Sequence, residues 1–388
     1  MEMTLIMKNI NKLLLITASL MVVNSYAQTK MNFPDIPGYQ TLKCDFHLHT
    51  VYSDGSVWPN FRVMEALRDG LDVIAMTDHI DFESYPEFIE KDYNKPYEIA
   101  GKAAEGKKLI VINGGEISPR VSPYHNNAIF LKDVNKLPID YMQTTEKKFV
   151  MKDHIDKKEL IAPFLEAQKQ DAFVFYNHPG YAWWDKKDTA IFTGLHKELH
   201  EKGIIKGIEV VNGRYNIIAH RIAEKYNLTL LGNSDAHADV FYTYRTSHRP
   251  VTLAFVKDKT EEGVKEALKK KRTAVYVDDF IIARYPEADA LFKASLETSF
   301  EKRVRNGEPI LSVTIINKSD VPYSIRMTAP YNIENYPLGQ MILKPHEPRT
   351  FVVKEMWDNP SLIELDVEVY NVVVSPEQNL RTKIQLQL

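Results

Sequence analysis

Short apolar segments that alternate with amphipathic helical segments dominate residues 45–284 of this 388-residue chain. Helical segments such as 57–69 and 217–226 follow apolar segments that have the length of a β-strand. Strands that alternate with helices predict a parallel sheet, which either closes into an α/β barrel or stays open and doubly wound. The candidate strands are residues 45–50, 72–77, 109–113, 125–131, 172–176, 207–211 and 228–231.

The positions of the polar residues favour the barrel. Most of the apolar segments end in His, Asp or Glu. In α/β barrels the active site lies at the carboxyl ends of the strands, where the connecting loops meet. We therefore expect residues 44–297 to form a barrel with functional side chains gathered at one end.

The sequence pattern changes after about residue 285. Residues 310–316, 323–328, 350–353 and 363–373 are β-rich, lack a helical period and are separated by turn residues. This pattern predicts that residues 298–388 form a small all-β domain, an immunoglobulin-like sandwich. Its one histidine, His346, lies in a turn, so we expect a stabilising or docking role for this domain.

The N-terminus has the layout of a secretory signal peptide. Lys8 and Lys12 precede the apolar run 13–23, and the small residues Ser25 and Ala27 form a cleavage site. The run is short for a membrane span, and an uncleaved anchor is the alternative. We predict a signal peptide over residues 1–27 and a linker over 28–43. The protein is then secreted or periplasmic in a bacterium, with no stable membrane anchor.

Charge and cysteine content exclude several classes of function. The formal net charge of −3 gives no electrostatic basis for a specific nucleic-acid partner. Cys44 is the only cysteine, so neither a disulfide framework nor a cysteine-based zinc site can form. Any metal ion must therefore be bound by His, Asp and Glu.

The segment DFHLHT, residues 45–50, carries the first candidate ligands. His47 and His49 are two residues apart, so on a strand they point to the same face and can reach one point in space. The following Ser53-Asp54-Gly55 turn can bring Asp54 back toward the pair. Taken alone, such a histidine pair is common, and an aspartate before glycine is an ordinary turn residue.

Later strand ends add more residues of the same kind. Six of the twelve histidines lie at predicted strand ends, although each alone would more often be structural than functional. Imidazole and carboxylate ligands without thiolate suit zinc, manganese or iron. Since one ion takes about four to six ligands, the set predicts two or three divalent ions. The candidate ligands are His47, His49, Asp54, His79, Glu116, His125, His178, Asp235 and His237.

The motifs H-x-H-T, S-D-G, T-D-H, G-E, N-H-P and S-D-x-H, in this order over residues 45–284, resemble those of the PHP (polymerase and histidinol phosphatase) superfamily. The pattern also resembles the secreted bacterial phosphodiesterases of the Sb-PDE type, which carry a C-terminal β extension. The resemblance implies a distorted (βα)7 TIM-like barrel with a trinuclear metal site. It implies that the first ion is bound by His47, His49, Glu116 and Asp235, the second by Glu116, His125 and His178, and the third by Asp54, His79 and His237.

The resemblance also implies a reaction. A hydroxide that bridges two of the ions would attack phosphorus, because two nearby cations lower the pKa of a shared water toward neutrality. Glu116, Asp235 and His237 are the expected catalytic residues. Asp78 is expected to take part by orienting His79 or a metal-bound water.

The substrate is expected to be a small-molecule phosphoester. Arg214 and Arg245 are candidate phosphate contacts, because guanidinium pairs bidentately with phosphate, and a surface salt bridge is the alternative for either. We expect a secreted metal-dependent hydrolase of phosphoric esters. Diesters are favoured, because a signal peptide argues against histidinol phosphate, which belongs to cytoplasmic histidine biosynthesis. The alternatives are a phosphomonoesterase acting on a nucleotide or sugar phosphate, and a non-catalytic metal-containing binding protein.

Overall fold

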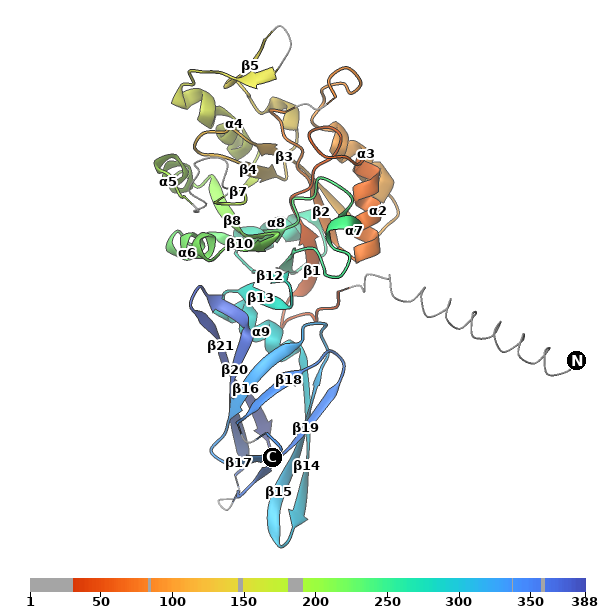
Figure 1. Cartoon of the computed structure of the whole chain (residues 1–388), viewed down its shortest axis with the longest axis vertical. Coiled ribbons are helices and arrows are strands. Elements are labelled where there is room, and N and C mark those ends of the chain that lie inside the picture. The colour runs from red at the N-terminus through yellow and green to blue at the C-terminus, as the bar shows by residue number, and fades with distance from the viewer. Residues whose placement is uncertain (1–30, 83–84, 146–148, 181–190, 337, 357–359) are drawn as a thin grey trace, which may run out of the picture.

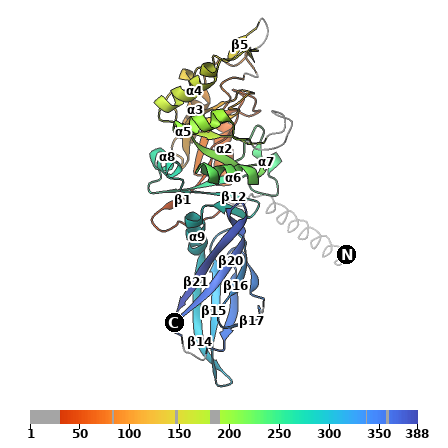
Figure 2. The same ribbon diagram turned by 90° about the vertical axis from the view of Figure 1, so that its left-hand side faces the viewer.

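The computed structural model describes residues 31–82, 85–145, 149–180, 191–336, 338–356 and 360–388. They form two bodies, an α/β domain and an elongated β domain, stacked along the long axis of the molecule (Figure 1). Helix α9 (Tyr285–Ala294) lies where the two domains meet (Figure 2). The predicted signal peptide lies outside the described residues. Within the described ranges, no helix combines the length and the apolar character needed to cross a membrane.

The α/β domain is built on one mixed sheet with the strand order β10-β8-β7-β4-β3-β2-β1-β11-β12-β13. Strands β1, β2 and β3 are parallel, as are β7, β8 and β10, and the remaining neighbours are antiparallel. The strands are β1 (Gln40–Asp45), β2 (Val73–Met76), β3 (Ile110–Ile117), β4 (Asn126–Ile129), β7 (Phe173–Tyr176), β8 (Ile205–Asn212), β10 (Thr229–Asn233), β11 (Val251–Val256), β12 (Thr273–Val277) and β13 (Phe280–Ala283).

The far end of this strand order returns to the middle, so that β10 lies beside β11 and β12. The Thr252 hydroxyl on β11 accepts a hydrogen bond from the Gly232 amide on β10 and donates one to the Gly232 carbonyl, both at 2.9 Å. A side chain at Gly232 is excluded, since its Cβ would lie 2.2 Å from Cγ1 of Val275 on β12. The sheet therefore curves into a distorted barrel whose last seam is made by side-chain contacts.

Amphipathic helices cover the outside of the barrel, and local signals set their ends. Helix α2 begins at Pro59 and is capped after Asp69 by Gly70, whose φ of 72° lets its amide donate a hydrogen bond back to the last turn. Asn216 caps α6 by accepting hydrogen bonds from amides of the first turn. The helices are α2 (Pro59–Asp69), α3 (Lys95–Ala104), α4 (Lys157–Lys169), α5 (Gly194–Glu201), α6 (Ile217–Lys225), α7 (Val240–Thr243) and α8 (Glu261–Lys269), with a 3-10 turn at Val134–Lys136 and short strands β5 (Met142–Thr144), β6 (Phe149–Met151) and β9 (Arg214–Tyr215).

Two details of the predicted sheet are wrong. First, the sheet is mixed and not parallel. Residues 118–125, all of them described, contain no helix that could carry the chain back across the sheet. The chain therefore reverses directly, and β4 pairs antiparallel with β3 and β7. The barrel also contains β11, β12 and β13, which were not among the seven candidate strands and are joined antiparallel to β1 and to one another.

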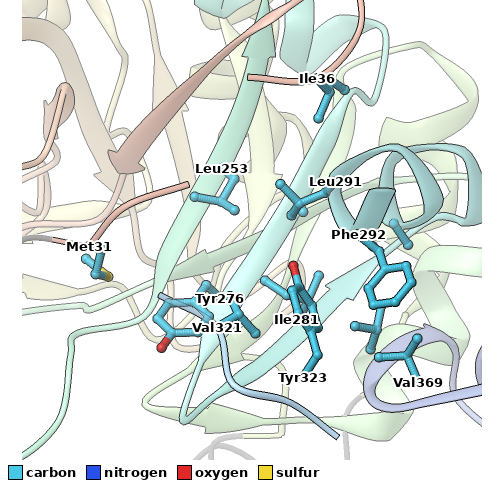
Figure 3. Packing of buried hydrophobic residues seen from close by; sticks show 14 of the residues in the cluster. Met31, Ile36, Leu253, Tyr276, Ile281, Leu291, Phe292, Val321, Tyr323 and Val369 are labelled. Atoms are coloured by element: carbon cyan, nitrogen blue, oxygen red, sulfur yellow. The ribbon is translucent and has the colours of Figure 1, made fainter. Parts of the chain in front are cut away.

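The predicted linker over residues 28–43 is also wrong where the structure describes it. Residues from Gln40 onward form β1. Met31 and Ile36 are buried in the core at the domain junction (Figure 3). The Asn32 amide donates a hydrogen bond to the carboxylate of Asp320 in the β domain at 2.7 Å. The apolar side chains of this segment therefore pack between the domains, which a free tether would not do.

The β domain is a sandwich of two sheets. One sheet has the strand order β14-β15-β19-β17. In the other sheet β20 lies between β21 and β16, and β16 also pairs with β18. Strand β20 also pairs parallel with β13 of the barrel, which joins the two domains through backbone hydrogen bonds. The predicted fold class is confirmed. The strands are β14 (Leu296–Arg305), β15 (Glu308–Asn317), β16 (Tyr323–Thr328), β17 (Asn332–Glu334), β18 (Gln340–Leu343), β19 (Pro348–Lys354), β20 (Leu362–Ser375) and β21 (Gln378–Gln387).

Candidate metal centre

The nine predicted ligands gather at one end of the barrel. His47, His79, His178 and Asp235 follow the carboxyl ends of β1, β2, β7 and β10. His125 precedes β4 instead, and because β4 runs antiparallel to β3 its start lies at the same end. The strand order therefore explains why residues far apart in the sequence converge.

The ligand atoms form four overlapping groups, in each of which they lie within 4.8 Å of one another. We call three of these four groups the inner groups and the fourth the outer group. Shared residues connect them, so the centre is continuous. The inner groups are His47, His49 and Glu116; His47, His178 and Asp235; and His79, Glu116 and His125; the outer group is His49, Asp54, His79 and His237.

Glu116 lies at the middle of the inner groups, inside β3 and not on a loop beyond it. Its Oε2 lies 3.4 Å from Nε2 of His47 and 3.3 Å from Nε2 of His49. Its Oε1 lies 2.9 Å from Nδ1 of His125 and accepts a hydrogen bond from Nδ2 of Asn177 at 2.9 Å. The two oxygens of one carboxylate thus face different imidazoles, which is the geometry of a bridging ligand.

Two buried carboxylate oxygens fit metal ions. Among the described residues, no hydrogen-bond donor is placed to serve Glu116 Oε2 or Asp235 Oδ1. Asp235 Oδ1 lies 3.1 Å from Nε2 of both His47 and His49. A buried ionised oxygen without a partner is costly, and cations between these oxygens and nitrogens would remove that cost. The donor set suits zinc, manganese or iron.

Two of the inner ligands have a backbone conformation that L-residues seldom adopt. His178 has a φ of 26° and Asp235 a φ of 51°. His178 also precedes Pro179, which restricts its backbone further. Such residues cost of order 1–3 kcal/mol each and cluster at functional sites. The strain aims both side chains into the centre.

The outer group depends on a tight turn. Asp54 lies 3.2 Å from Nε2 of His237 and 3.5 Å from both Nδ1 of His49 and Nε2 of His79. Gly55 makes this possible, because a Cβ there would lie 2.6 Å from the His49 carbonyl carbon. The side chains of Asp54 and His237 are 34% and 41% exposed, whereas those of His47 and Glu116 are fully buried. The outer group therefore reaches solvent through Asp54 and His237, while His49 and His79 are buried.

Glu209 on β8 is a site residue that the sequence analysis did not select. Its Oε1 lies 2.9 Å from Nδ1 of His47, and its Oε2 accepts a hydrogen bond from the His178 amide at 2.7 Å. The carboxylate fixes the proton of His47 on Nδ1 and leaves Nε2 to face the other ligands. A buried carboxylate in the apolar sequence GIEVV was the signal that could have identified it.

A buried chain of hydrogen bonds orients His79 in a similar way. Nδ1 of His79 lies 2.6 Å from the Ser118 hydroxyl, which donates a short hydrogen bond to Asp81. Asp81 also accepts a hydrogen bond from the Tyr141 hydroxyl at 2.7 Å. Because the serine hydroxyl donates to Asp81, it accepts from Nδ1–H of His79, and Nε2 is left to face Asp54. No spacing in the sequence indicated these three partners.

Known proteins share both domains of this chain. Residues 45–285, more than half of the chain, match the PHP domain. The chain belongs to the PHP family. This confirms the resemblance inferred from the motifs, and the match contains all nine predicted ligands of the PHP domain. Residues 296–385 match an Ig-like domain, DUF5001.

Two proteins similar to this PHP protein illustrate its relationships. A crystal structure from Bacteroides vulgatus, of a two-domain protein containing a predicted PHP-like metal-dependent phosphoesterase, is 33% identical with a TM-score of 0.78. The similarity covers 92% of this chain and 98% of that one. An uncharacterised protein of Methanocaldococcus jannaschii is 28% identical over 205 residues, 51% of this chain and 82% of that protein. The PHP protein described here is a metal-dependent hydrolase, as predicted.

The electrostatics of the PHP centre favour cations. Burial opposes ionisation of Glu116 and Asp235, yet the surrounding imidazoles hold the pKa of both carboxyls well below the usual range. Burial also disfavours charge on His79, but Glu116 and Asp54 raise its pKa to about 10. Burial is the main reason that the pKa of His49 falls to about 4. The ionised carboxylates thus stabilise positive charge in a buried site.

Asp78 lies behind the outer group of the PHP domain. Its carboxylate accepts hydrogen bonds from the Thr50 amide and the Ser53 hydroxyl, each at 2.7 Å. It therefore holds the segment that connects His49 to Asp54. The predicted catalytic contribution of Asp78 stays a prediction, and the geometry describes a residue that supports the turn.

The two predicted phosphate contacts lie on the surface of the PHP domain. Arg214 is exposed on β9, and Arg245 is exposed in the segment after α7. The Arg245 guanidinium lies over the ring of Tyr242, 5.2 Å from its centroid. Their role as a phosphate clamp stays a prediction.

Proposed function

We propose that this PHP protein hydrolyses phosphoesters, with phosphodiesters preferred, and that it binds two or three divalent ions. The observation that carries the proposal is Glu116, whose two oxygens face imidazoles of different groups within one buried centre. Divalent ions bound there would supply Lewis acidity and activate water near neutral pH. Zinc, manganese and iron are the candidates.

The residues of the chain have separate tasks in this proposal. Glu116 and Asp235 hold negative charge between the imidazoles. Glu209 keeps Nε2 of His47 turned toward the centre. His237, half exposed at the solvent side, is positioned to contact the incoming ester. The protein supplies orientation and a fixed charge distribution, and it needs no nucleophilic side chain.

Aromatic side chains near the outer group support the preference for diesters. Phe82 is 40% exposed, and its ring lies 6.3 Å from the ring of His79. Trp58 is 52% exposed and packs edge-on against Tyr52, 6.2 Å away, beside the Asp54 turn. A diester has a second organic substituent that must lie against the protein, and exposed rings offer it apolar contact.

We also propose that the protein acts outside the cytoplasm. The support is the sequence of residues 1–27, with its basic start, apolar run and small residues at the cleavage position. Fractionation of cells that express the full chain, followed by N-terminal sequencing, tests this proposal. A new N-terminus near Gln28 in the periplasm or medium is expected, and uncleaved protein in the cytoplasm would contradict it.

Turnover of two matched substrates tests the reaction. The chain from Gln28 onward, loaded with manganese or zinc, should cleave bis(p-nitrophenyl) phosphate with a higher kcat/KM than p-nitrophenyl phosphate. His178→Ala and Asp235→Ala should abolish this turnover, and His346→Ala in the β domain should leave it unchanged. Phe82→Ala should lower kcat/KM for the diester more than for the monoester.

The alternatives correspond to distinct results of the same assay. A higher kcat/KM for the monoester would identify a phosphomonoesterase. Bound metal without turnover of either ester would favour a non-catalytic metal-containing protein. Metal analysis of the same preparation gives the number of ions, which distinguishes a centre of two from a centre of three.

A further inference from the structure

Arg62 on α2 is fully buried beneath the outer group, although it belongs to no ligand group. Its Nε donates a hydrogen bond to the His49 carbonyl at 2.9 Å. Its Nη2 donates to the Ala236 carbonyl at 2.8 Å, and its Nη1 donates to the Ala238 carbonyl at 2.9 Å. One guanidinium therefore binds the backbone of His49 and the residues on both sides of His237.

Glu65, one turn along the same helix, completes this arrangement. Its Oε2 accepts a hydrogen bond from Nη1 of Arg62 at 2.7 Å, and its Oε1 accepts one from the Val240 amide at 2.7 Å. The pair therefore binds carbonyls and an amide of the loop 236–240. A buried charged pair that satisfies backbone groups of two ligand-bearing segments does more than fill the core.

We propose that Arg62 is a positioning residue that sets the distance between His49 and His237 and so controls binding of an ion at the outer group. His49 follows β1 and His237 follows β10, and the described contacts join the two segments near their ligands. The His49 amide donates to the Ala236 carbonyl at 3.1 Å, and the Ser56 amide donates to the His237 carbonyl at 2.7 Å. The rigid guanidinium of Arg62 supplies three further hydrogen bonds in addition to these two backbone hydrogen bonds.

The rigid fork of arginine is the feature that matters. The three accepting carbonyls belong to separate residues, and a guanidinium presents its donors in fixed, divergent directions. Lysine would keep the charge but concentrate its donors on one nitrogen, so it cannot serve three carbonyls in this arrangement. Arg62→Lys should therefore leave the helix and its charge in place while loosening His237 relative to His49.

The inference rests on the proposed function only in assuming that the groups bind divalent ions. Manganese binding to the chain from Gln28 onward, measured by calorimetric titration and by elemental analysis, tests it. We assign the weakest class of sites to the more exposed outer group. Arg62→Lys should weaken that class by about 10- to 100-fold and weaken the tighter classes less, since His49 is shared with an inner group. Arg221→Lys, on the exposed surface of α6, is the matched control and should bind manganese as the wild type does.

Each other result is decisive. Unchanged manganese binding by Arg62→Lys, with only a lower Tm, would show that Arg62 is merely structural. Equal weakening of all sites in a folded variant would show that the effect is not confined to the outer group. If Arg62→Lys does not fold, Glu65→Gln serves as the second variant, with a smaller weakening of the same class expected and unchanged binding contradicting the proposal.

The proposed function can fail separately. Wild-type protein that binds manganese at the weak class but turns over no phosphoester would refute the function and leave the role of Arg62 intact. Wild-type protein with no weak class of sites would refute the role of Arg62, whether or not the enzyme is active.

Discussion

The inner groups and the outer group of the metal centre are held in place by different means. Glu116 projects from within a strand, and Glu209, also on a strand, orients His47. Asp54 instead projects from a turn, and His237 from a loop, and both are about one-third or more exposed. Strands fix side chains through the ladder of a buried sheet, whereas turns and loops need contacts of their own. We therefore expect the inner ions to bind more tightly than the outer one.

Loss of the Glu116 charge should have the largest effect on the inner groups. Glu116→Gln keeps the shape of the side chain but removes the charge that the surrounding imidazoles face. We expect kcat to fall by roughly 10³-fold or more, because the bridging charge that orders the whole centre is lost. Steady-state kinetics and elemental analysis should show loss of both activity and inner metal. Glu98→Gln on the exposed face of α3 is the control, and equal activity of the two variants would refute the central role of Glu116.

Glu209 tests whether the inner groups depend on partners behind the ligands. Glu209→Gln weakens the acceptor for Nδ1–H of His47 and for the His178 amide. Partners of this kind contribute about 10- to 100-fold to metal affinity. We expect Glu209→Gln to lower the manganese affinity of the inner sites by this factor and to leave the affinity of the outer site unchanged, as measured by titration. If Glu209→Gln instead lost manganese affinity only at the weakest class of sites, Glu209 would support the outer group and not the inner groups. Glu224→Gln, exposed on α6, controls for the loss of a charge.

Gly55 tests the turn that supports the outer group. An alanine Cβ there would lie 2.6 Å from the His49 carbonyl carbon and from the Thr50 amide nitrogen, so the turn must shift and move Asp54. We expect about tenfold weaker outer binding and a similar loss of kcat/KM, since displacements near 1 Å cost up to about 10²-fold. Gly101→Ala in α3 meets no atom within 4 Å and should be neutral or slightly stabilising. A Gly55→Ala variant with normal manganese binding would show that the turn adapts.

The sequence could predict that the nine candidate ligands converge, because their positions follow from topology. His, Asp and Glu just after apolar strands must meet where the carboxyl ends of those strands meet, and the antiparallel β4 brings its first residues to the same place. The motifs of a known family then divided those ligands among ions, a division that composition and spacing alone could not make. The β-sandwich could be predicted for a similar reason, because a run of short alternating strands without helices is compatible with few architectures.

The roles of the residues behind the ligands could not be predicted from the sequence. Glu209 carries a local signal, a carboxylate within an apolar strand, whereas Arg62 is a polar residue in an ordinary amphipathic helix. Whether either side chain faces solvent or the centre depends on contacts far away in the chain. Arg62 is buried because the loop 236–240 covers it, and nothing within α2 indicates that loop. The same holds for residues 31–39, which read as a polar tether until the domain junction supplies a core for Met31 and Ile36.

A buried histidine that lies away from the carboxylates of the metal centre offers a second comparison. His47 and His196 are both fully buried, and burial disfavours charge on each. At His47 the carboxylates of Asp235, Glu209 and Glu116 overcome that effect and raise the pKa. His196 packs against the rings of Tyr176 and Phe192, and burial lowers its pKa to about 3.

This difference makes His196 a source of acid sensitivity. Above about pH 6.5 the imidazole is neutral in both the folded and the unfolded chain, so it contributes no pH dependence. As the pH falls from about 6.5 toward 3, the unfolded chain binds a proton that the folded chain does not, and the free energy of unfolding drops by about 1.4 kcal/mol per pH unit.

The variant His196→Gln isolates this contribution. Glutamine does not titrate, and at this position it can keep the capping contact with the Thr193 amide that Nδ1 of His196 now accepts at 3.1 Å. Denaturant unfolding at pH 7.5 and at pH 5.0 should show the stability difference between variant and wild type shifting by about 2 kcal/mol in favour of the variant at the lower pH. A difference that stays constant between the two values would mean that His196 can be protonated within the folded chain. In that case burial alone would not distinguish His196 from the histidines that the carboxylates of the metal centre surround.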